Sequence, residues 1–171
     1  MANFIIGTIK IPEVKGVYVH TLAINTGPWA MFHLDKENNL YPSLVFSTLK
    51  LLRESSLEFV LNTDVISFFD VGKIHAVVLC DKSQTRYVLW ATNCTSQTKK
   101  VSIMFDDIKK KQTICTQKYL SDQDINASNR ENKSKVLLKT RLLNTTLDKN
   151  GKYIVELPPN SITTTEIKYL K

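Results

Sequence analysis

The spacing of apolar residues in this 171-residue chain changes near Ser55. Before this point, apolar residues recur every three to four positions, which is the pattern of an amphipathic helix. Beyond Ser56 they alternate with polar residues, which is the pattern of a β-strand with one buried face. A chain with this change must fold as a short helix-containing segment followed by a mainly β domain. The sequence therefore predicts two parts, residues 1–55 and residues 56–171.

The first part is predicted to contain helical turns, one strand and one amphipathic helix. Residues 2–10 are predicted to form the last turns of a helix, which Pro12 ends. Val17–Ile24 is a nearly continuous apolar run, which suits a strand buried on both faces, as in a parallel sheet. Pro42 stands where the first helical residue is expected, and the apolar spacing after it predicts a helix that ends near Arg53.

The second part is predicted to be an antiparallel sandwich. Residues 99–106 alternate between apolar and polar positions, which requires a sheet with one face in water. Short apolar runs joined by turns rich in Asp and Gly are typical of a sandwich, and residues 121–134 are predicted to form a long surface loop. The predicted strands are Leu57–Leu61, Val65–Phe69, Ile74–Cys80, Arg86–Thr92, Lys99–Phe105, Thr113–Tyr119, Val136–Leu143, Tyr153–Leu157 and Ile162–Tyr169. The predicted fold class is mainly β, an antiparallel β-sandwich preceded by a short strand–loop–helix segment.

The charge of the chain permits an acidic partner but specifies none. The formal net charge is +7, and the basic residues come in short groups such as Lys99–Lys100 and Lys109–Lys111. Solvated strand ends and turns explain these groups, and neither an arginine-rich helix nor an aromatic stacking platform is present, so we expect no specific nucleic-acid partner. No apolar run approaches the ~20 residues of a membrane-spanning helix, and the N-terminus lacks the features of a secretory signal.

Cysteine and histidine spacing predicts no metal site and no cofactor. Cys80, Cys94 and Cys115 are odd in number and lie in separate segments, which argues against a disulfide framework and leaves one bridge open. Their spacing matches no zinc motif, and the three histidines are far apart. Cys80 ends an apolar run, which indicates a buried thiol. The chain has four Asn-x-Ser/Thr sequences, at Asn93, Asn126, Asn132 and Asn144. A chain rich in Asn, Ser and Thr produces such sequences by chance, so they do not indicate secretion.

Short motifs and single aromatic residues identify no catalytic site. The sequence contains no Gly-rich phosphate loop, no G-x-S-x-G and no Cys-x-x-Cys. Trp90 lies between Leu89 and Ala91 in a predicted strand. Sandwiches commonly bury one large aromatic side chain between their sheets, so Trp90 is predicted to be a core residue rather than a binding residue.

The order of the segments suggests a family. The first part contains an apolar strand, a break, an aromatic run and a turn that opens a helix; these are Val17–Leu22, Asn25–Gly27, Trp29–Leu34 and Asn39–Pro42. The second part contains a strand with a large aromatic residue, Tyr87–Asn93, and a closing run, Leu157–Thr164. This order resembles the C-terminal region of retaining TIM-barrel glycoside hydrolases, that is, the last barrel strand and helix and the β-sandwich domain. The arabinofuranosidase, xylosidase, glucosylceramidase and heparanase-like groups share this layout. The resemblance covers nearly the whole chain, and segment order carries it rather than a diagnostic motif.

The resemblance implies that this chain has no catalytic carboxylates. Retaining glycosidases use an acid/base and a nucleophile about 5–5.5 Å apart. In the family these glutamates lie near the ends of the fourth and seventh barrel strands. If Val17–Ile24 corresponds to the eighth strand, both positions precede Met1. Glu13, Asp35 and Glu37 lie in predicted turns, where solvated carboxylates are expected. We therefore expect a portion that is inactive alone; a full enzyme containing it would be a retaining glycosidase.

The resemblance also implies which residues would contact a sugar. Residues at the carboxyl ends of barrel strands line the pocket. Trp29 would stack on a sugar ring, His33 and Asn25 would donate hydrogen bonds beside it, and His20 would point inward from the strand. The simpler interpretation is favoured for three of them: loop packing for Trp29, and ordinary core or surface histidines for His33 and His20.

Three functions remain open at this level. The first is a non-catalytic accessory portion that a barrel domain or a second chain completes. The second is a free-standing carbohydrate-binding module, in which Trp29 or an exposed aromatic residue such as Tyr119 contacts the glycan. The third is a protein-interaction sandwich whose basic face meets an acidic partner. Carbohydrate is the ligand class that the resemblance implies, and an extracellular or lysosomal-type compartment would follow if the chain belongs to a secreted glycosidase.

Overall fold

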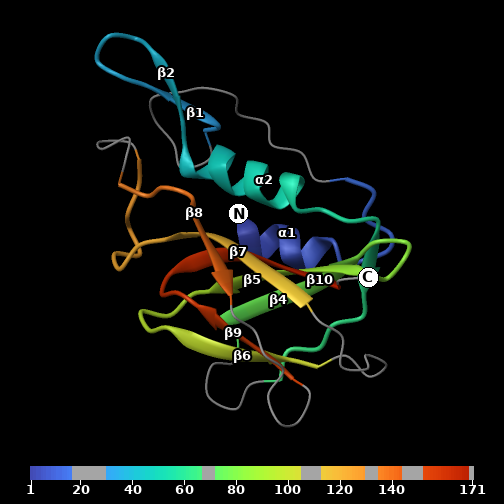
Figure 1. The fold of residues 1–171 in the computed structure, drawn as a ribbon. Coiled ribbons are helices and arrows are strands. Elements are labelled where there is room, and N and C mark those ends of the chain that lie inside the picture. The colour runs from blue at the N-terminus through green and yellow to red at the C-terminus, as the bar shows by residue number, and fades with distance from the viewer. Residues whose placement is uncertain (17–29, 67–71, 105–112, 130–134, 144–151, 170–171) are drawn as a thin grey trace.

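The computed structural model describes residues 1–16, 30–66, 72–104, 113–129, 135–143 and 152–169 (Figure 1). The predicted strand Val17–Ile24 lies outside the described residues. The helices are α1 (Ala2–Thr8) and α2 (Leu44–Glu54), as predicted. The strands are β1 (Phe32–Leu34), β2 (Leu40–Pro42), β3 (Phe59–Leu61), β4 (Ile74–Cys80), β5 (Arg86–Asn93), β6 (Lys99–Ile103), β7 (Thr113–Ser121), β8 (Lys139–Leu143), β9 (Tyr153–Leu157) and β10 (Ser161–Tyr169).

The described strands form one large sheet, one small sheet and one hairpin, all antiparallel. The large sheet has six strands in the order β3-β4-β5-β10-β7-β8, so the C-terminal strand β10 lies at its centre. The small sheet pairs β6 with β9, and the hairpin pairs β1 with β2. Figure 1 shows α1 and α2 on one side of the large sheet and the small sheet on the other. The predicted fold class, a mainly β antiparallel sandwich, is confirmed.

Each face of the large sheet covers its own hydrophobic core. The core toward the small sheet contains alternate residues of β4, β5, β7 and β10 together with Tyr153, Val155 and Leu157 of β9. The core toward the helices contains the residues between them, together with Ile6 of α1 and Leu51 of α2. The side chains of a strand alternate between faces, so one strand supplies both cores.

Trp90 is a core residue, as predicted, but it lies in the other core. It is 4% exposed and belongs to the core beneath the helices, not to the core between the two sheets. Its indole Nε1 donates a hydrogen bond to Oγ of Ser55, just beyond the end of α2, at 2.9 Å. The indole therefore links the last turn of α2 to the centre of the sheet.

Three predicted boundaries were wrong for reasons visible in the backbone. Pro42 ends β2 rather than beginning α2, because Ser43 caps the helix and accepts the Phe46 N–H at 3.2 Å. Val136 does not belong to β8, because the Asn129 side-chain amide binds both its N–H and its C=O. Residues 65–66 are not in a strand, and the rest of that predicted strand lies outside the described residues.

Candidate functional site

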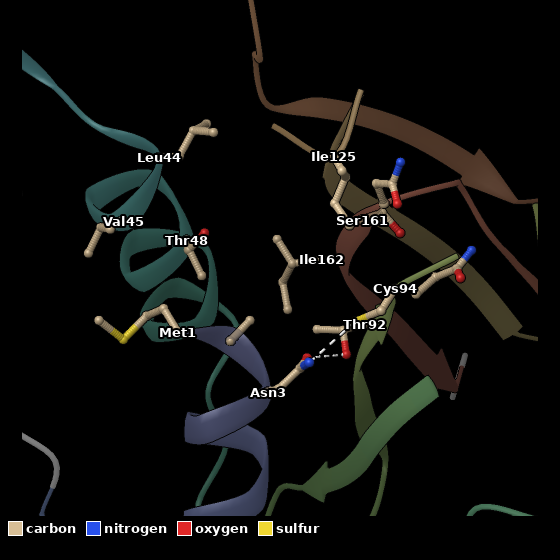
Figure 2. A pocket seen from close by; sticks show the side chains of 13 residues that line it. Met1, Asn3, Leu44, Val45, Thr48, Thr92, Cys94, Ile125, Ser161 and Ile162 are labelled. Atoms are coloured by element: carbon tan, nitrogen blue, oxygen red, sulfur yellow. Dashed lines mark hydrogen bonds between the residues drawn. The ribbon is translucent and has the colours of Figure 1, made fainter. Parts of the chain in front are cut away.

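A groove of about 390 Å³ opens between the helices and one end of the large sheet. It lies where α1 and the first turns of α2 approach the ends of β5 and β10, and the segment after β7 forms part of its rim (Figure 2). Such a volume is at the lower end of the range for small-ligand sites. The lining residues are Met1, Ala2, Asn3, Leu44, Val45, Thr48, Thr92, Asn93, Cys94, Ile125, Asn160, Ser161 and Ile162.

The groove combines aliphatic and uncharged polar side chains. Leu44, Val45 and Ile162 supply aliphatic surface, while asparagine, threonine and serine side chains supply hydrogen-bonding groups. Among the residues that the structure describes, the lining includes no Asp, Glu, Lys, Arg or His, but Met1 brings the N-terminal ammonium group to it. The described side chains therefore offer hydrogen-bonding groups and apolar surface, and none of them is a histidine or carboxylate of the kind that most often acts as a general acid or base.

A series of side-chain hydrogen bonds joins three residues that line the groove. Oγ1 of Thr92 donates to Oδ1 of Asn3 at 2.5 Å, and Nδ2 of Asn3 donates to Sγ of Cys94 at 3.3 Å (Figure 2). Sulfur is a weak acceptor, so the Asn3 amide keeps most of its capacity to donate. The sequence contained no signal for these residues, because they come from segments about 90 positions apart.

Asn93 borders the groove but is committed to the fold. It is 1% exposed, and its Nδ2 lies within 2.8–3.1 Å of the carbonyl oxygens of Gln97, Leu157 and Pro158. Its Oδ1 accepts from the backbone N–H and the hydroxyl of Thr95. Both ends of this amide are therefore occupied, and the Asn-Cys-Thr sequence at this position has a structural use.

Of the four residues that the sequence suggested for sugar binding, one can be placed. Trp29, Asn25 and His20 lie outside the described residues. His33 is in the β1–β2 hairpin opposite Tyr41, with ring centroids 5.6 Å apart, and it does not line the groove. Its Nδ1 is buried without a hydrogen bond to any residue that the structure describes.

One face of the Tyr119 ring lies against a cationic side chain. It is half-buried in β7, and the guanidinium of Arg141 in β8 lies 5.4 Å from its ring centroid. Cation–π contact of this kind occupies the ring face that a sugar would need. The alternative role of Tyr119 as an exposed glycan-stacking residue therefore has no support in this arrangement.

The carboxylates that can be placed serve turns and ion pairs. Glu13 and Glu37 lie in turns, and Oδ1 of Asp35 accepts the backbone N–H of Glu37 and of Asn39. Within the large and small sheets, carboxylates pair with basic side chains on the neighbouring strand; these pairs are Glu166 with Arg86 and Glu156 with Lys100. None of them lines the groove.

Among the described residues, two carboxyl groups have a lowered pKa, so both stay ionised at neutral pH. For Asp81, burial raises the pKa, but hydrogen bonds from Ser83, Arg86 and Thr85 outweigh it and lower the net value. For Asp124, the hydrogen bond from the Asn126 backbone N–H lowers the pKa. A glycosidase acid requires a raised pKa. Neither residue has the property of such an acid.

A second pocket of about 320 Å³ lies beside α1 and contains charged groups. Its lining includes Lys10, Asp64 and His75. Nζ of Lys10 donates to the Thr63 carbonyl at 3.1 Å, and Nε2 of His75 lies 3.1 Å from the Gly72 carbonyl. Of the titratable side chains that the structure describes in this pocket, Lys10 and His75 already lie against backbone carbonyls, so it is a weaker candidate than the groove.

All three cysteines are free thiols. Cys80 and Cys115 are buried, as predicted for Cys80, and burial raises the pKa of the Cys80 thiol. In the register of the large sheet, Tyr87 and Ile167 stand between Cys80 and Cys115. Three strand spacings amount to ~14 Å, twice the reach of a disulfide. The structure therefore rules out a bridge between the two buried thiols, and Cys94 is exposed at the groove.

Two further features can be stated for the described part of the chain. Neither α1 nor α2 has the length and apolar character required to cross a membrane. His, Cys, Asp and Glu side chains do not gather in groups of three or more that could hold a metal ion among the residues placed here.

Comparison with known proteins gives a fold and no family. No family model and no curated protein matches this chain. Among solved structures, an arabinose-bound GH51 α-L-arabinofuranosidase is similar with a TM-score of 0.79 and 16% identity, over 99% of this chain and 27% of that enzyme. The thermostable GH51 α-L-arabinofuranosidase from Thermotoga petrophila RKU-1 has a TM-score of 0.66 and 19% identity, over 82% of this chain and 32% of that enzyme.

A second group of glycoside hydrolases has the same fold. The catalytic domain of GH30 xylanase C from Talaromyces cellulolyticus is similar with a TM-score of 0.61 and 12% identity, over 98% of this chain and 34% of that chain. The chain thus spans about a third or less of the length of these enzymes. The similarity is to a segment of glycoside hydrolases, as the order of sequence segments suggested.

Proposed function

We propose that this chain is a non-catalytic accessory β-sandwich portion of a glycoside-hydrolase-like protein. The observation that carries the proposal is the similarity of 99% of the chain to 27% of the arabinose-bound arabinofuranosidase, with a TM-score of 0.79. The helices support it, because α1 and α2 pack on the sheet and bring residues 1–55 into contact with residues 56–171. In this proposal, residues 1–55 are the end of a barrel and the rest is the sandwich that supports it.

The chemistry of the described carboxylates agrees with this function. Asp35 caps a turn, Glu166 and Glu156 pair with Arg86 and Lys100, and none of the described carboxylates lines the groove. A retaining mechanism needs two carboxyl groups facing one another across a sugar. The catalytic groups belong, in this proposal, to a barrel domain or to a second chain.

A turnover assay and a chimera test this function. The purified chain is incubated with aryl α-L-arabinofuranoside, β-D-xyloside and β-D-glucoside, and we expect no hydrolysis above buffer. In the chimera, this chain replaces the matched segment of the arabinofuranosidase, with an unrelated sandwich of similar size as the control. We expect soluble, active enzyme only from the first chimera. Turnover by the chain alone that disappears on substitution of one of its carboxylates would refute the proposal.

A second candidate function is a free-standing carbohydrate-binding module. The asparagine, threonine and serine side chains that line the groove favour it, because a neutral glycan needs hydroxyl and amide partners. The two functions differ in their behaviour on insoluble polysaccharide. A module is retained on arabinan, xylan or cellulose, whereas a supporting sandwich passes through.

A further inference from the structure

We propose that Asn126 is an acceptor for an N-linked glycan in a chain that enters the endoplasmic reticulum, and that Asn93 is not. Both residues head an acceptor sequence, Asn-Cys-Thr at Asn93 and Asn-Ala-Ser at Asn126. The substrate class is an oligosaccharide carried on a lipid pyrophosphate. Asn132 and Asn144 lie outside the described residues. The proposal goes beyond the proposed function, because it assigns a modification to this chain whether or not a barrel completes it.

The transfer joins one side-chain atom of asparagine to the sugar. A bond forms between Nδ2 and the anomeric carbon of the first sugar, the bond from that carbon to the pyrophosphate oxygen breaks, and the lipid pyrophosphate leaves. Nδ2 gives up one of its two protons to solvent and keeps the other. A modified asparagine in a folded chain therefore needs space for a bulky group beside Nδ2, and it can donate only one hydrogen bond from that atom.

Asn93 meets neither requirement. It is 1% exposed. Its Nδ2 lies 2.8 Å from the carbonyl oxygen of Gln97, 3.1 Å from that of Leu157 and 2.8 Å from that of Pro158. A sugar on Nδ2 would have to occupy the space of these carbonyl groups and would remove one of the hydrogens that bind them. The fold is therefore incompatible with a glycan at Asn93.

Asn126 meets both requirements. It is exposed, in the segment between β7 and β8. The turn around it is held by backbone N–H groups: that of Asn126 donates to Oδ1 of Asp124 at 2.9 Å, and that of Ala127 donates to the Asp124 carbonyl at 3.0 Å. A sugar on Nδ2 of Asn126 leaves both of these bonds intact. A surface turn of this kind is the context expected for an acceptor sequence.

The test is site-resolved mass spectrometry of the full 171-residue chain, secreted from eukaryotic cells behind a cleavable signal peptide. Trypsin separates the sites, because peptides 87–99 and 119–130 carry one acceptor sequence each and Asn132 falls on the next peptide. From the folded chain, we expect a glycan on most copies of peptide 119–130 and none on peptide 87–99. Asn126→Gln keeps an amide but removes the acceptor, and should abolish the first glycan without changing the urea midpoint.

A matched variant separates burial from sequence. Cys94→Ala together with Thr95→Ser gives Asn93 the same Asn-Ala-Ser sequence as Asn126. Serine keeps the hydroxyl that donates to Oδ1 of Asn93, so the variant retains this contact. We expect Asn93 to stay unmodified in the folded variant. A difference in occupancy between two identical sequences then reflects their surroundings in the fold.

A second measurement does not depend on the yield of secretion. The chain is translated in the presence of microsomes, which modify acceptors during synthesis, and the soluble and aggregated fractions are digested separately. We expect Asn126 to be modified in both fractions and Asn93 to be unmodified in the soluble fraction. The proposal is overturned if Asn126 is unmodified in most soluble chains from either source, or if soluble, folded chain carries a glycan at Asn93. Neither result bears on the turnover assay or the chimera, so the accessory function stands or fails separately.

Discussion

The two faces of the large sheet are buried to a similar degree but by different kinds of partner. On one face the small β6–β9 sheet covers a core that contains two cysteines and three tyrosines. On the other face the short helices α1 and α2 cover a core with Trp90 at its centre and the groove at its margin. The two pockets described above both border α1 on the helix-covered face. The comparison teaches that the ligand-sized space arises on the helix-covered face.

The small sheet is attached through side chains that bind its backbone, whereas the helices are attached through side-chain pairs such as Thr92 with Asn3 and Trp90 with Ser55. Nε2 of Gln117 donates to the Glu156 carbonyl at 3.0 Å, and Nη2 of Arg141 donates to the same carbonyl at 3.0 Å. Asn93 donates to carbonyls at the end of the same strand. Side chains of the large sheet thus bind the backbone of β9 from two positions, which fixes the small sheet in register as well as in place.

The largest expected effect is at the helix-covered face. Trp90→Ala leaves a cavity under both helices and should cost about 3–5 kcal/mol of the free energy of unfolding. The measurement is urea denaturation followed by circular dichroism. Trp90→Phe keeps most of the ring volume and loses the bond to Ser55, so it should cost clearly less. An unchanged urea midpoint for Trp90→Ala would show that the helices do not depend on this core.

A pair of leucines compares the two faces directly. Leu51 in α2 and Leu157 in β9 are each 1% exposed or less, and each Leu→Ala change should cost about 3 kcal/mol. Because both cores share one sheet, we expect each variant to unfold in a single transition that all probes report alike. Two separate transitions in either variant would contradict this and would show that the faces unfold independently.

Asn93 tests the polar attachment of the small sheet. Asn93→Ala removes the donor for three carbonyl oxygens and should cost about 2–3 kcal/mol, because those groups stay buried. Asn126→Ala is the matched control, since Asn126 is exposed and also heads an Asn-x-Ser sequence; its effect should stay within about 0.5 kcal/mol. Equal stability of the two variants in thermal melts would show that the Asn93 side chain does not stabilise the attachment of the small sheet.

The smallest expected effect lies in the β4–β5 turn, outside both cores. Asp81→Asn should cost about 1 kcal/mol at pH 7, reduced by partial exposure. The fold lowers the pKa of Asp81, so its contribution is present above the unfolded value of 3.8 and is lost as pH falls through the folded value. Denaturation series at pH 7 and at pH below 3.8 measure this, with Glu13→Gln as a control. A difference between wild type and Asp81→Asn that persists at the lower pH would contradict the assignment.

Local sequence patterns predicted the positions of the strands better than they predicted what packs around each strand. The bounds of β4 and β9 match the predicted runs, and the helix of residues 44–54 was visible from its spacing. β4 and β5 nevertheless correct one assumption. They are buried on both faces and nearly continuous in apolar residues, yet their pairing is antiparallel. A continuous apolar run therefore indicates that both faces are covered, and does not by itself indicate a parallel sheet.

The site was less predictable than the fold. His33 could be proposed from a resemblance, but Asn3, Thr48, Thr92 and Ser161 form no motif, and neither their type nor their local spacing is unusual. They meet only because α1 and α2 lie over the ends of β5 and β10. A groove made by four distant segments has no signature in any one of them.

The sequence by itself determined α2 and most strands of the two sheets, though not the β1–β2 hairpin, and it determined which of their residues are buried. These properties follow from residue type and from periods of 3.6 and 2, which are local. Only the tertiary structure decided what covers each face: that Trp90 packs under helices, that the two buried cysteines stand three strands apart, and that a groove opens beside α2. The physical reason is that the burial of a side chain follows from its residue type and from the local period. Which element packs against that side chain depends on long-range packing, which many sequences satisfy equally well.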